Sequence, residues 1–265
     1  MSMQDTTAVK KGYAEVNGIH MYYEIYGNGN PLVLIHGGGS TIQTSFGRII
    51  PLLSKNRQVI AVELQAHGHT SDRDAPLSFA QDANDVVTLL KDLGIPKADL
   101  LGFSNGGQTA MQIAISYPER VNKLILAASF YKRAGVPDGF WKAMDHAQFS
   151  DMPQAFKDEY MKINNDSAKL LNMFHRDVVR MQTFKDWSDN DLTSIAAPTL
   201  IIIGDRDVPT PEHAVAMHHL ISNSRLAIIP GVHGQFLGEI TTLDNGKWKQ
   251  EYVADLFEQF LVSTF

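Results

Sequence analysis

Short apolar runs rich in branched residues alternate with longer stretches of helical periodicity along this chain. The apolar runs predict strands at residues 32–36, 59–64, 98–103, 123–129, 199–204 and 226–230. The stretches with helical spacing lie at residues 41–53, 79–93, 105–117, 211–221 and 247–261. Continuous apolar strands are typical of a parallel sheet that helices cover on both faces, because neither face of such a strand meets water. The pattern therefore predicts a doubly wound α/β fold.

Two further apolar and polar alternating runs precede these strands. Residues 12–16 and 19–26 flank the dipeptide Asn17-Gly18, which is the strongest short-range signal for a hairpin. We therefore expect a mostly parallel sheet of about eight strands that opens with an antiparallel pair. Ligands of doubly wound sheets bind outside the carboxyl ends of the strands, so functional residues are expected in the loops that follow them.

Residues 131–197 form a connection between two predicted strands that is far longer than usual. Such a segment is expected to carry structure of its own, and its aromatic and methionine residues recur at helical spacing. The sequence therefore predicts a core domain formed by residues 1–130 and 198–265, with residues 131–197 inserted as a helical cap. Packing accounts for many of these apolar side chains, but such residues also line adaptable pockets. Trp141 and Met144 are the candidate pocket residues.

Composition narrows the classes of function. The chain has 265 residues, of which 44% are hydrophobic, and this is enough for one large core. A net charge of -6 and the lack of a long basic run argue against nucleic acid as a partner. No apolar stretch approaches the roughly 18 residues that span a bilayer, so we expect no membrane partner. The absence of cysteine excludes disulfides and thiolate metal sites and fits a cytoplasmic location.

Ser104 is the strongest candidate for chemistry. It lies at the centre of a G-x-S-x-G sequence, residues 102–106, which directly follows an apolar run and directly precedes a helical one. A turn this short between a strand and a helix leaves little room, so glycine is needed on both sides of the serine. The serine is expected in a strained conformation that presents its hydroxyl above the sheet.

Four short motifs occur along the chain, and their combined order indicates a protein family more specifically than any single motif does. Residues 36–39 (His-Gly-Gly-Gly) follow the first parallel strand, residues 102–106 contain the serine, and residues 204–207 and 231–234 follow late strands. With these motifs the chain resembles the α/β-hydrolase fold family over nearly its whole length, and in particular its serine esterases and lactonases with a helical cap. The order serine, aspartate, histidine is the one that this family uses.

A serine hydroxyl needs a base to remove its proton as it attacks. His233 is the candidate base, because it follows the last strand at the same edge of the sheet as Ser104; the family usually has glycine before this histidine, where Val232 stands here. The resemblance selects Asp207 as the acid that orients the histidine. Asp205 is the alternative, and either aspartate could instead cap the helix that follows.

Attack on a carbonyl places negative charge on its oxygen, which two backbone N–H groups can stabilise. One donor is expected from Asn105, the first residue of the helix after the serine. The family resemblance implies that the second donor is Gly38, with Gly37 or Gly39 as alternatives. A glycine run is also common in flexible turns. The same residues can form the turn and supply the backbone donor.

The histidines elsewhere do not indicate a metal site. His67 and His69 form an H-x-H sequence, but no further ligands are evident near it. His213, His218 and His219 fall on one predicted helix and are expected on the solvated surface. No nucleotide-binding glycine motif occurs either, so we expect neither a metal nor another cofactor.

Together these features predict a serine hydrolase that cleaves a small or medium carboxylic ester or lactone through an acyl-serine intermediate. The same residues would also serve a carbon–carbon bond hydrolase, a perhydrolase or an amidase. A different class of function, a noncatalytic receptor that holds a small ligand under the cap, is the remaining alternative. The partner is expected to be a small-molecule substrate, and the oligomeric state is left open.

Overall fold

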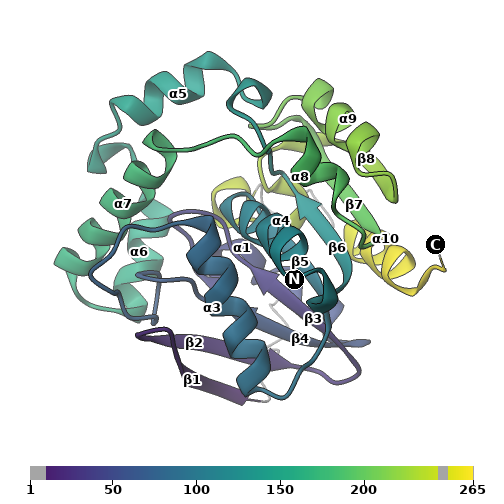
Figure 1. Ribbon diagram of the computed structural model, residues 1–265. Helices are drawn as coiled ribbons and strands as arrows, with labels where there is room; N and C mark the ends of the chain where they lie inside the picture. Colours follow the sequence, from purple (N-terminus) through teal and green to yellow (C-terminus); the bar gives the residue numbers. More distant parts are fainter. Residues whose placement is uncertain (1–9, 244–249, 265) are drawn as a thin grey trace.

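One sheet organises the part of the chain, residues 10–243 and 250–264, that the computed structural model describes. In this part the sheet has eight strands in the order β1-β2-β4-β3-β5-β6-β7-β8 (Figure 1). Their bounds are β1 Lys10–Val16, β2 Ile19–Tyr26, β3 Asn30–Ile35, β4 Arg57–Val62, β5 Ala98–Phe103, β6 Val121–Ala127, β7 Thr199–Arg206 and β8 Ser224–Val232. Strands β1 and β2 pair in antiparallel fashion and β2 pairs antiparallel with β4, whereas the remaining neighbours are parallel.

Helices cover both faces of this sheet. The helices outside the long β6–β7 connection are α1 Ile42–Phe46, α2 Ile50–Leu53, α3 Phe79–Asp92, α4 Asn105–Ser116, α9 Pro211–Leu220 and α10 Glu251–Val262. Short 3-10 helices span Pro118–Arg120, Arg133–Gly135, Phe149–Asp151, Gln235–Leu237 and Ile240–Thr242. In β3, Val33 belongs to a core cluster that also contains residues of α3, α4 and α9, whereas its neighbour Leu34 belongs to a second cluster with residues of α1, α2 and α10. Because successive strand residues point to opposite faces, these two cores confirm the predicted doubly wound sheet.

The predicted hairpin and helices are close to the observed ones, with one exception. Asn17 and Gly18 have φ angles of 47° and 85°, as the turn of a tight hairpin requires. The helix predicted over residues 41–53 is wrong as a single element, because α1 and α2 are separate. Pro51 lies in the first turn of α2, and a proline inside one continuous helix would lose a backbone bond and clash with the preceding turn. Of the last predicted helix, residues 247–249 lie outside the described residues.

The connection from β6 to β7 is a long helical excursion, which we call the inserted segment (residues 128–198). It contains α5 Asp138–Asp145, α6 Gln154–Ile163, α7 Ser167–Gln182 and α8 Asp189–Thr193. In Figure 1, α5, α6 and α7 stand together on the side of the sheet opposite α10. The two ends of this excursion lie next to each other, because the backbone N–H of Trp187 donates to the Tyr131 carbonyl at 3.0 Å. None of the helices in the described part of the chain is long and apolar enough to cross a membrane.

The inserted segment also buries a histidine that the sequence placed at the surface. His213 is only 9% exposed, and its Nε2 accepts the Tyr131 N–H while the two rings stack at 4.8 Å. Gly135 lies so close that a Cβ there would be 2.3 Å from the His213 ring. Burial, aided by the nearby Lys132 charge, lowers the pKa of His213 to about 4. The surface prediction for His213 was wrong, because the helix period does not show that the inserted segment covers the start of α9.

Candidate active site

Strand β5 delivers Ser104 into a tight turn before α4. The serine has φ 53° and ψ -123°, a left-handed conformation that costs a non-glycine residue about 1–3 kcal/mol. A Cβ on Gly102 would lie 2.2 Å from the Gly106 carbonyl oxygen, and a Cβ on Gly106 would lie 2.0 Å from the Ile35 oxygen. Both glycines are therefore required by close backbone contacts, as the sequence predicts.

Three side chains from different loops form a continuous chain of hydrogen bonds at this edge of the sheet. His233 Nε2 lies 3.1 Å from Ser104 Oγ, and His233 Nδ1 lies 2.5 Å from Asp207 Oδ1. Asp205, the alternative acid, instead accepts the Gly231 N–H at 2.8 Å. The structure thus brings Asp207, and not Asp205, to the histidine.

The carboxylate of Asp207 is fixed by backbone donors. Its side chain is 0% exposed, and the N–H groups of Gly204 and Val208 donate to its two oxygens at 2.8 and 2.7 Å. These two bonds fix the orientation of the carboxylate beside the histidine. Asp207 is therefore suited to hold the Nδ1–H tautomer of His233, which leaves Nε2 free to accept a proton from the serine.

The ring of His233 is held by packing as well as by hydrogen bonds. It contacts the Phe103 ring at a centroid distance of 4.9 Å and keeps 31% of its side chain exposed. Val232, where the family usually has glycine, is 44% exposed at the end of β8. A side chain that points to solvent does not crowd the histidine, so the valine is compatible with this geometry.

The backbone N–H groups of the glycine run after β3, residues 37–39, differ in their hydrogen-bond partners. The Gly37 N–H donates to Ser45 Oγ at 3.3 Å, and the Gly39 N–H donates to Asp177 Oδ2 at 2.6 Å. Among the hydrogen bonds of the described residues, the Gly38 amide has no acceptor. Only Gly38 of the three is thus free to bind another group.

The side chain of Asn105 lies next to Gly38. Asn105 is the first residue of α4, and the first N–H groups of a helix have no acceptor within it. A Cβ on Gly38 would be 2.5 Å from Asn105 Nδ2, so the glycine loop and the start of α4 are in direct contact. The two residues that the sequence predicts as donors are therefore neighbours beside Ser104, and their role as donors stays a prediction.

Residues 30–171, more than half of the chain, match the family model described as the alpha/beta hydrolase fold. The chain belongs to this family. This hydrolase is 30% identical to serine hydrolase BPHL of Homo sapiens over 257 residues, which cover 89% of this chain and 86% of that protein. It is 28% identical to the pimeloyl-[acyl-carrier protein] methyl ester esterase of Nitrosomonas europaea, covering 82% and 94% of the two chains. A solved serine hydrolase involved in carbazole degradation superposes with a TM-score of 0.77 at 22% identity, covering 95% of this chain and 98% of that one.

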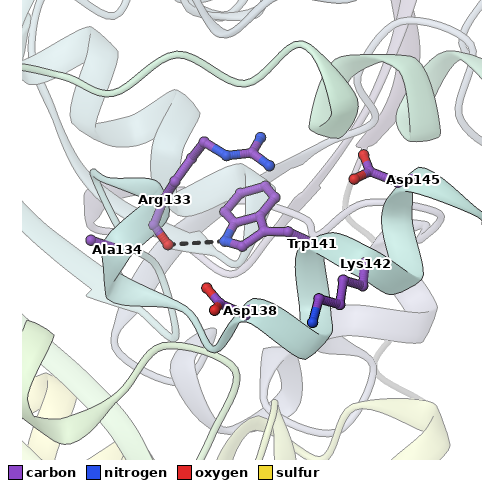
Figure 2. A pocket seen from close by; sticks show the side chains of 6 residues that line it. All are labelled: Arg133, Ala134, Asp138, Trp141, Lys142 and Asp145. Carbon is purple, nitrogen blue, oxygen red and sulfur yellow. Dashed lines mark hydrogen bonds between the residues drawn. The ribbon is translucent and has the colours of Figure 1, made fainter.

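The two pocket residues predicted for this α/β hydrolase lie within the inserted segment. Trp141 is 6% exposed, and its Nε1–H donates to the Arg133 carbonyl at 2.9 Å (Figure 2). The Arg133 guanidinium lies 3.9 Å from the centre of the indole ring. Met144 packs against the same aromatic cluster. These contacts explain Trp141 and Met144 as packing residues, and their role in substrate selection stays a prediction.

Beside Trp141 the hydrolase has a surface hollow of about 270 Å³. It is lined by Arg133, Ala134, Asp138, Trp141, Lys142 and Asp145, as Figure 2 shows. The charged side chains around it carry both signs. None of the residues that line it belongs to the Ser104–His233–Asp207 chain, so this hollow is separate from the catalytic edge of the sheet.

Two residues near the glycine run were not predicted. Met152 Cε would lie 3.7 Å from a Cβ on Gly39, and Asp177 accepts the Gly39 N–H. A signal for Asp177 was present, because Asp177 and Arg180 interrupt the apolar stripe of α7 that includes Leu170, Met173 and Met181. Charged residues on a buried helical face need partners, which makes them candidates for a specific contact.

The two histidines of the H-x-H sequence are held by separate carboxylates. His67 Nε2 lies 2.8 Å from Asp177 Oδ2, and His69 Nδ1 lies 2.9 Å from Glu63 Oε2. In residues 10–243 and 250–264 no group of three or more potential metal ligands is found. The H-x-H sequence therefore serves hydrogen bonding in the part of the hydrolase that the structure describes.

Proposed function

We propose that this hydrolase cleaves a small or medium carboxylic ester or lactone through an acyl-serine intermediate. The observation that carries the proposal is the unbroken chain from Ser104 Oγ to His233 and on to Asp207, with distances of 3.1 and 2.5 Å. A nucleophile, a base and an orienting acid in this geometry constitute a catalytic triad. The esterase from Nitrosomonas europaea, a relative along most of both chains, supports an ester as the substrate.

The reaction begins when Ser104 Oγ attacks the carbonyl carbon and His233 Nε2 takes the hydroxyl proton. Asp207 stabilises the resulting imidazolium through its bond to Nδ1–H. The tetrahedral intermediate collapses as His233 gives the proton to the leaving alcohol oxygen. Water then attacks the acyl-serine and passes a proton to His233, and the acid product leaves as Ser104 recovers the proton.

The free amides of Gly38 and Asn105 form the oxyanion hole in this proposal. Each donor of this kind is worth about 3 kcal/mol in barrier height. The positive end of the α4 dipole adds to the field at Asn105. Since both donors are backbone groups, they are in place before the substrate binds.

We also propose that residues 131–197 act as a cap over Ser104 and select the acyl group. Met152 lies against the glycine run and gives this side of the site an apolar surface, which suits an alkyl group more than a charged one. Activity should be compared across p-nitrophenyl esters from acetate to decanoate in the wild type, Met152→Ala, Met144→Ala and Trp141→Phe. A shift toward longer chains in Met152→Ala is expected, and an unchanged profile in the other two variants would remove Met144 and Trp141 as selectors.

The deciding experiment is labelling with a fluorophosphonate probe, followed by mass mapping of the modified residue. We expect labelling at Ser104 that disappears in Ser104→Ala. Ser129→Ala is the matched control, because Ser129 is a buried serine after β6 at the same edge of the sheet and should not affect labelling. A folded wild-type protein that is not labelled at Ser104 would contradict the proposal and favour a noncatalytic receptor.

A further inference from the structure

A buried ionic cluster joins the inserted segment to the core beneath the glycine run. Helix α7 contributes Asp177 and Arg180, the loop after β4 contributes His67, and α3 contributes Asp82. All four residues are at most 8% exposed. Arg180 Nη1 donates to Asp82 Oδ2 at 2.7 Å, and its Nη2 donates to Asp177 Oδ1. The cluster thus contains two ion pairs between α7 and the core, Arg180 with Asp82 and Asp177 with His67.

The hydrogen bonds of His67 show that its imidazole carries a positive charge. Nδ1 lies 2.8 Å from the Gln65 carbonyl oxygen, and Nε2 lies 2.8 Å from Asp177 Oδ2. The carbonyl can only accept, and Asp177, which also accepts from Arg180 and from the Gly39 N–H, is a carboxylate, so both ring nitrogens donate. Burial opposes this charge, but the adjacent Asp177 carboxylate outweighs it and raises the pKa of His67 above its ordinary value.

Asp177 is ionised and also contacts the glycine run. Burial disfavours its charge, yet the His67 and Arg180 cations outweigh burial and hold the pKa of Asp177 well below its usual range. Its Oδ2 atom is shared between His67 and the Gly39 N–H, which lies 2.6 Å away. An ionised acceptor makes a stronger hydrogen bond than a neutral one.

We propose that Asp177 is a positioning residue. It fixes the glycine run by accepting the Gly39 N–H, and so directs the neighbouring Gly38 N–H at the substrate oxygen. This inference rests on the proposed function. Gly39 has φ +66°, a conformation that favours glycine. Because glycine has no side chain, Gly39 cannot fix its own position through side-chain contacts. The bonds from Gly37 to Ser45 and from Gly39 to Asp177 secure both sides of Gly38.

The other ion pair separates this role from simple docking of the inserted segment. Asp82 and Arg180 also connect the core to α7, but no hydrogen bond joins Asp82 to the glycine run within the described residues. Removing both partners of a buried pair avoids an unpaired charge and costs less stability than removing one. A double variant of either pair therefore removes one connection to the core together with the Arg180–Asp177 bond within α7, and only the loss of Asp177 also removes the acceptor of the Gly39 N–H.

The experiment compares His67→Leu/Asp177→Leu with Asp82→Leu/Arg180→Met in steady-state kinetics on an ester that the wild type cleaves. We expect the first to lower kcat by about 10-fold to 100-fold, somewhat less than outright deletion of a hole donor, with little change in KM. Affinity for an alkyl boronic acid, which mimics the tetrahedral state, should fall by a similar factor. We expect the second variant to keep kcat within about threefold, because His67 still pairs with Asp177 and the Gly39 N–H retains its acceptor after the bond from Arg180 is lost.

Asp177→Asn gives an independent check if a double variant does not fold. Its amide oxygen can still accept the Gly39 N–H while the charge is lost, so it should retain more kcat than Asp177→Ala. Unchanged kcat in the His67→Leu/Asp177→Leu variant, or equal losses in both double variants, would overturn the positioning role. We expect hydrogen exchange of the Gly39 amide to accelerate only in variants that lack Asp177. This measurement tests whether Asp177 holds the Gly39 N–H even if Ser104 proves unreactive and the proposed function fails.

Discussion

At the scale of single residues, two neighbouring histidines show how strongly their surroundings set their charge. The rings of His36 and His67 lie 4.8 Å apart. His36 Nε2 accepts the Leu64 N–H and its Nδ1–H donates to the Gly37 carbonyl, so His36 is neutral. Burial and the nearby His67 charge lower the pKa of His36 to about 3, whereas Asp177 raises that of His67.

These opposite shifts predict opposite effects on stability. Below about pH 6.5 the unfolded chain takes up a proton on His36 that the folded chain refuses until about pH 3, so stability falls with decreasing pH by about 1.4 kcal/mol per unit. The contribution of His67 is present below about pH 6.5 and is lost as the pH rises through its raised folded pKa. Urea unfolding across pH should show a flatter acid limb in His36→Gln and a flatter alkaline limb in His67→Gln. Slopes equal to the wild type in both variants would contradict this account.

The residues of the triad could be predicted from sequence because each lies in a local motif. Ser104 has glycines that its turn requires, and Asp207 and His233 follow predicted strands at the edge where Ser104 lies. Asp177 could not be predicted in the same way, because it follows no predicted strand and no local motif marks its contact with Gly39, 138 positions away. That contact depends on how the inserted segment docks, which no local pattern describes.

At the scale of secondary-structure elements, α10 ends on a buried lysine of the sheet. Lys123 of β6 is 9% exposed, and its Nζ donates to the carbonyls of Phe260, Leu261 and Ser263 at 2.9, 2.9 and 2.6 Å. The last carbonyls of a helix have no partner within it. A cation at this end also interacts favourably with the helix dipole.

Lys123→Met should therefore destabilise the fold without altering the chemistry. We expect the free energy of unfolding to fall by about 1–3 kcal/mol, because the carbonyls at the end of α10 lose a charged donor. Chemical denaturation measures this loss, and Lys91→Met, which changes an exposed lysine of α3, should leave stability within about 0.5 kcal/mol. A large loss of kcat in folded Lys123→Met would contradict a purely structural role.

Elements themselves were predictable where one pattern dominates. Strand β5 was predicted at its observed bounds, because its apolar run leads directly into the G-x-S-x-G turn. The break between α1 and α2 was missed, because the apolar spacing continues across residues 47–49 while Pro51 and the turn before it end the helix. Periodicity shows which residues face the core, but local backbone bonds decide where a helix stops.

At the scale of the whole molecule, the inserted segment is attached to the core by polar contacts as well as by apolar packing. Arg176 of α7 donates to Asp72 Oδ2 at 2.6 Å, to the Ala75 carbonyl at 2.6 Å and to the Arg73 carbonyl at 3.0 Å. These bonds join α7 to the loop before α3. The placement of the segment over the core thus depends on a few named side chains.

Arg176→Ala should loosen this attachment. We expect faster hydrogen exchange in residues 167–182 and in residues 72–78, because three bonds between the two parts are lost. Mass spectrometry of exchange locates the effect, and Lys169→Ala, on the exposed part of the same helix, is the control. An exchange pattern identical to the wild type would show that the Arg176 bonds do not hold the segment in place.

The bond from Trp187 N–H to the Tyr131 carbonyl makes residues 132–186 a module whose two ends are neighbours. Insertions with adjacent ends can be exchanged with little disturbance of the host fold. Recombination between related genes could thus transplant a new module and a new substrate preference in a single event, while the β6–β7 crossover stays as it is. A successful graft would need a carboxylate at the place of Asp177, because the donor module must bring its own half of the bond to Gly39.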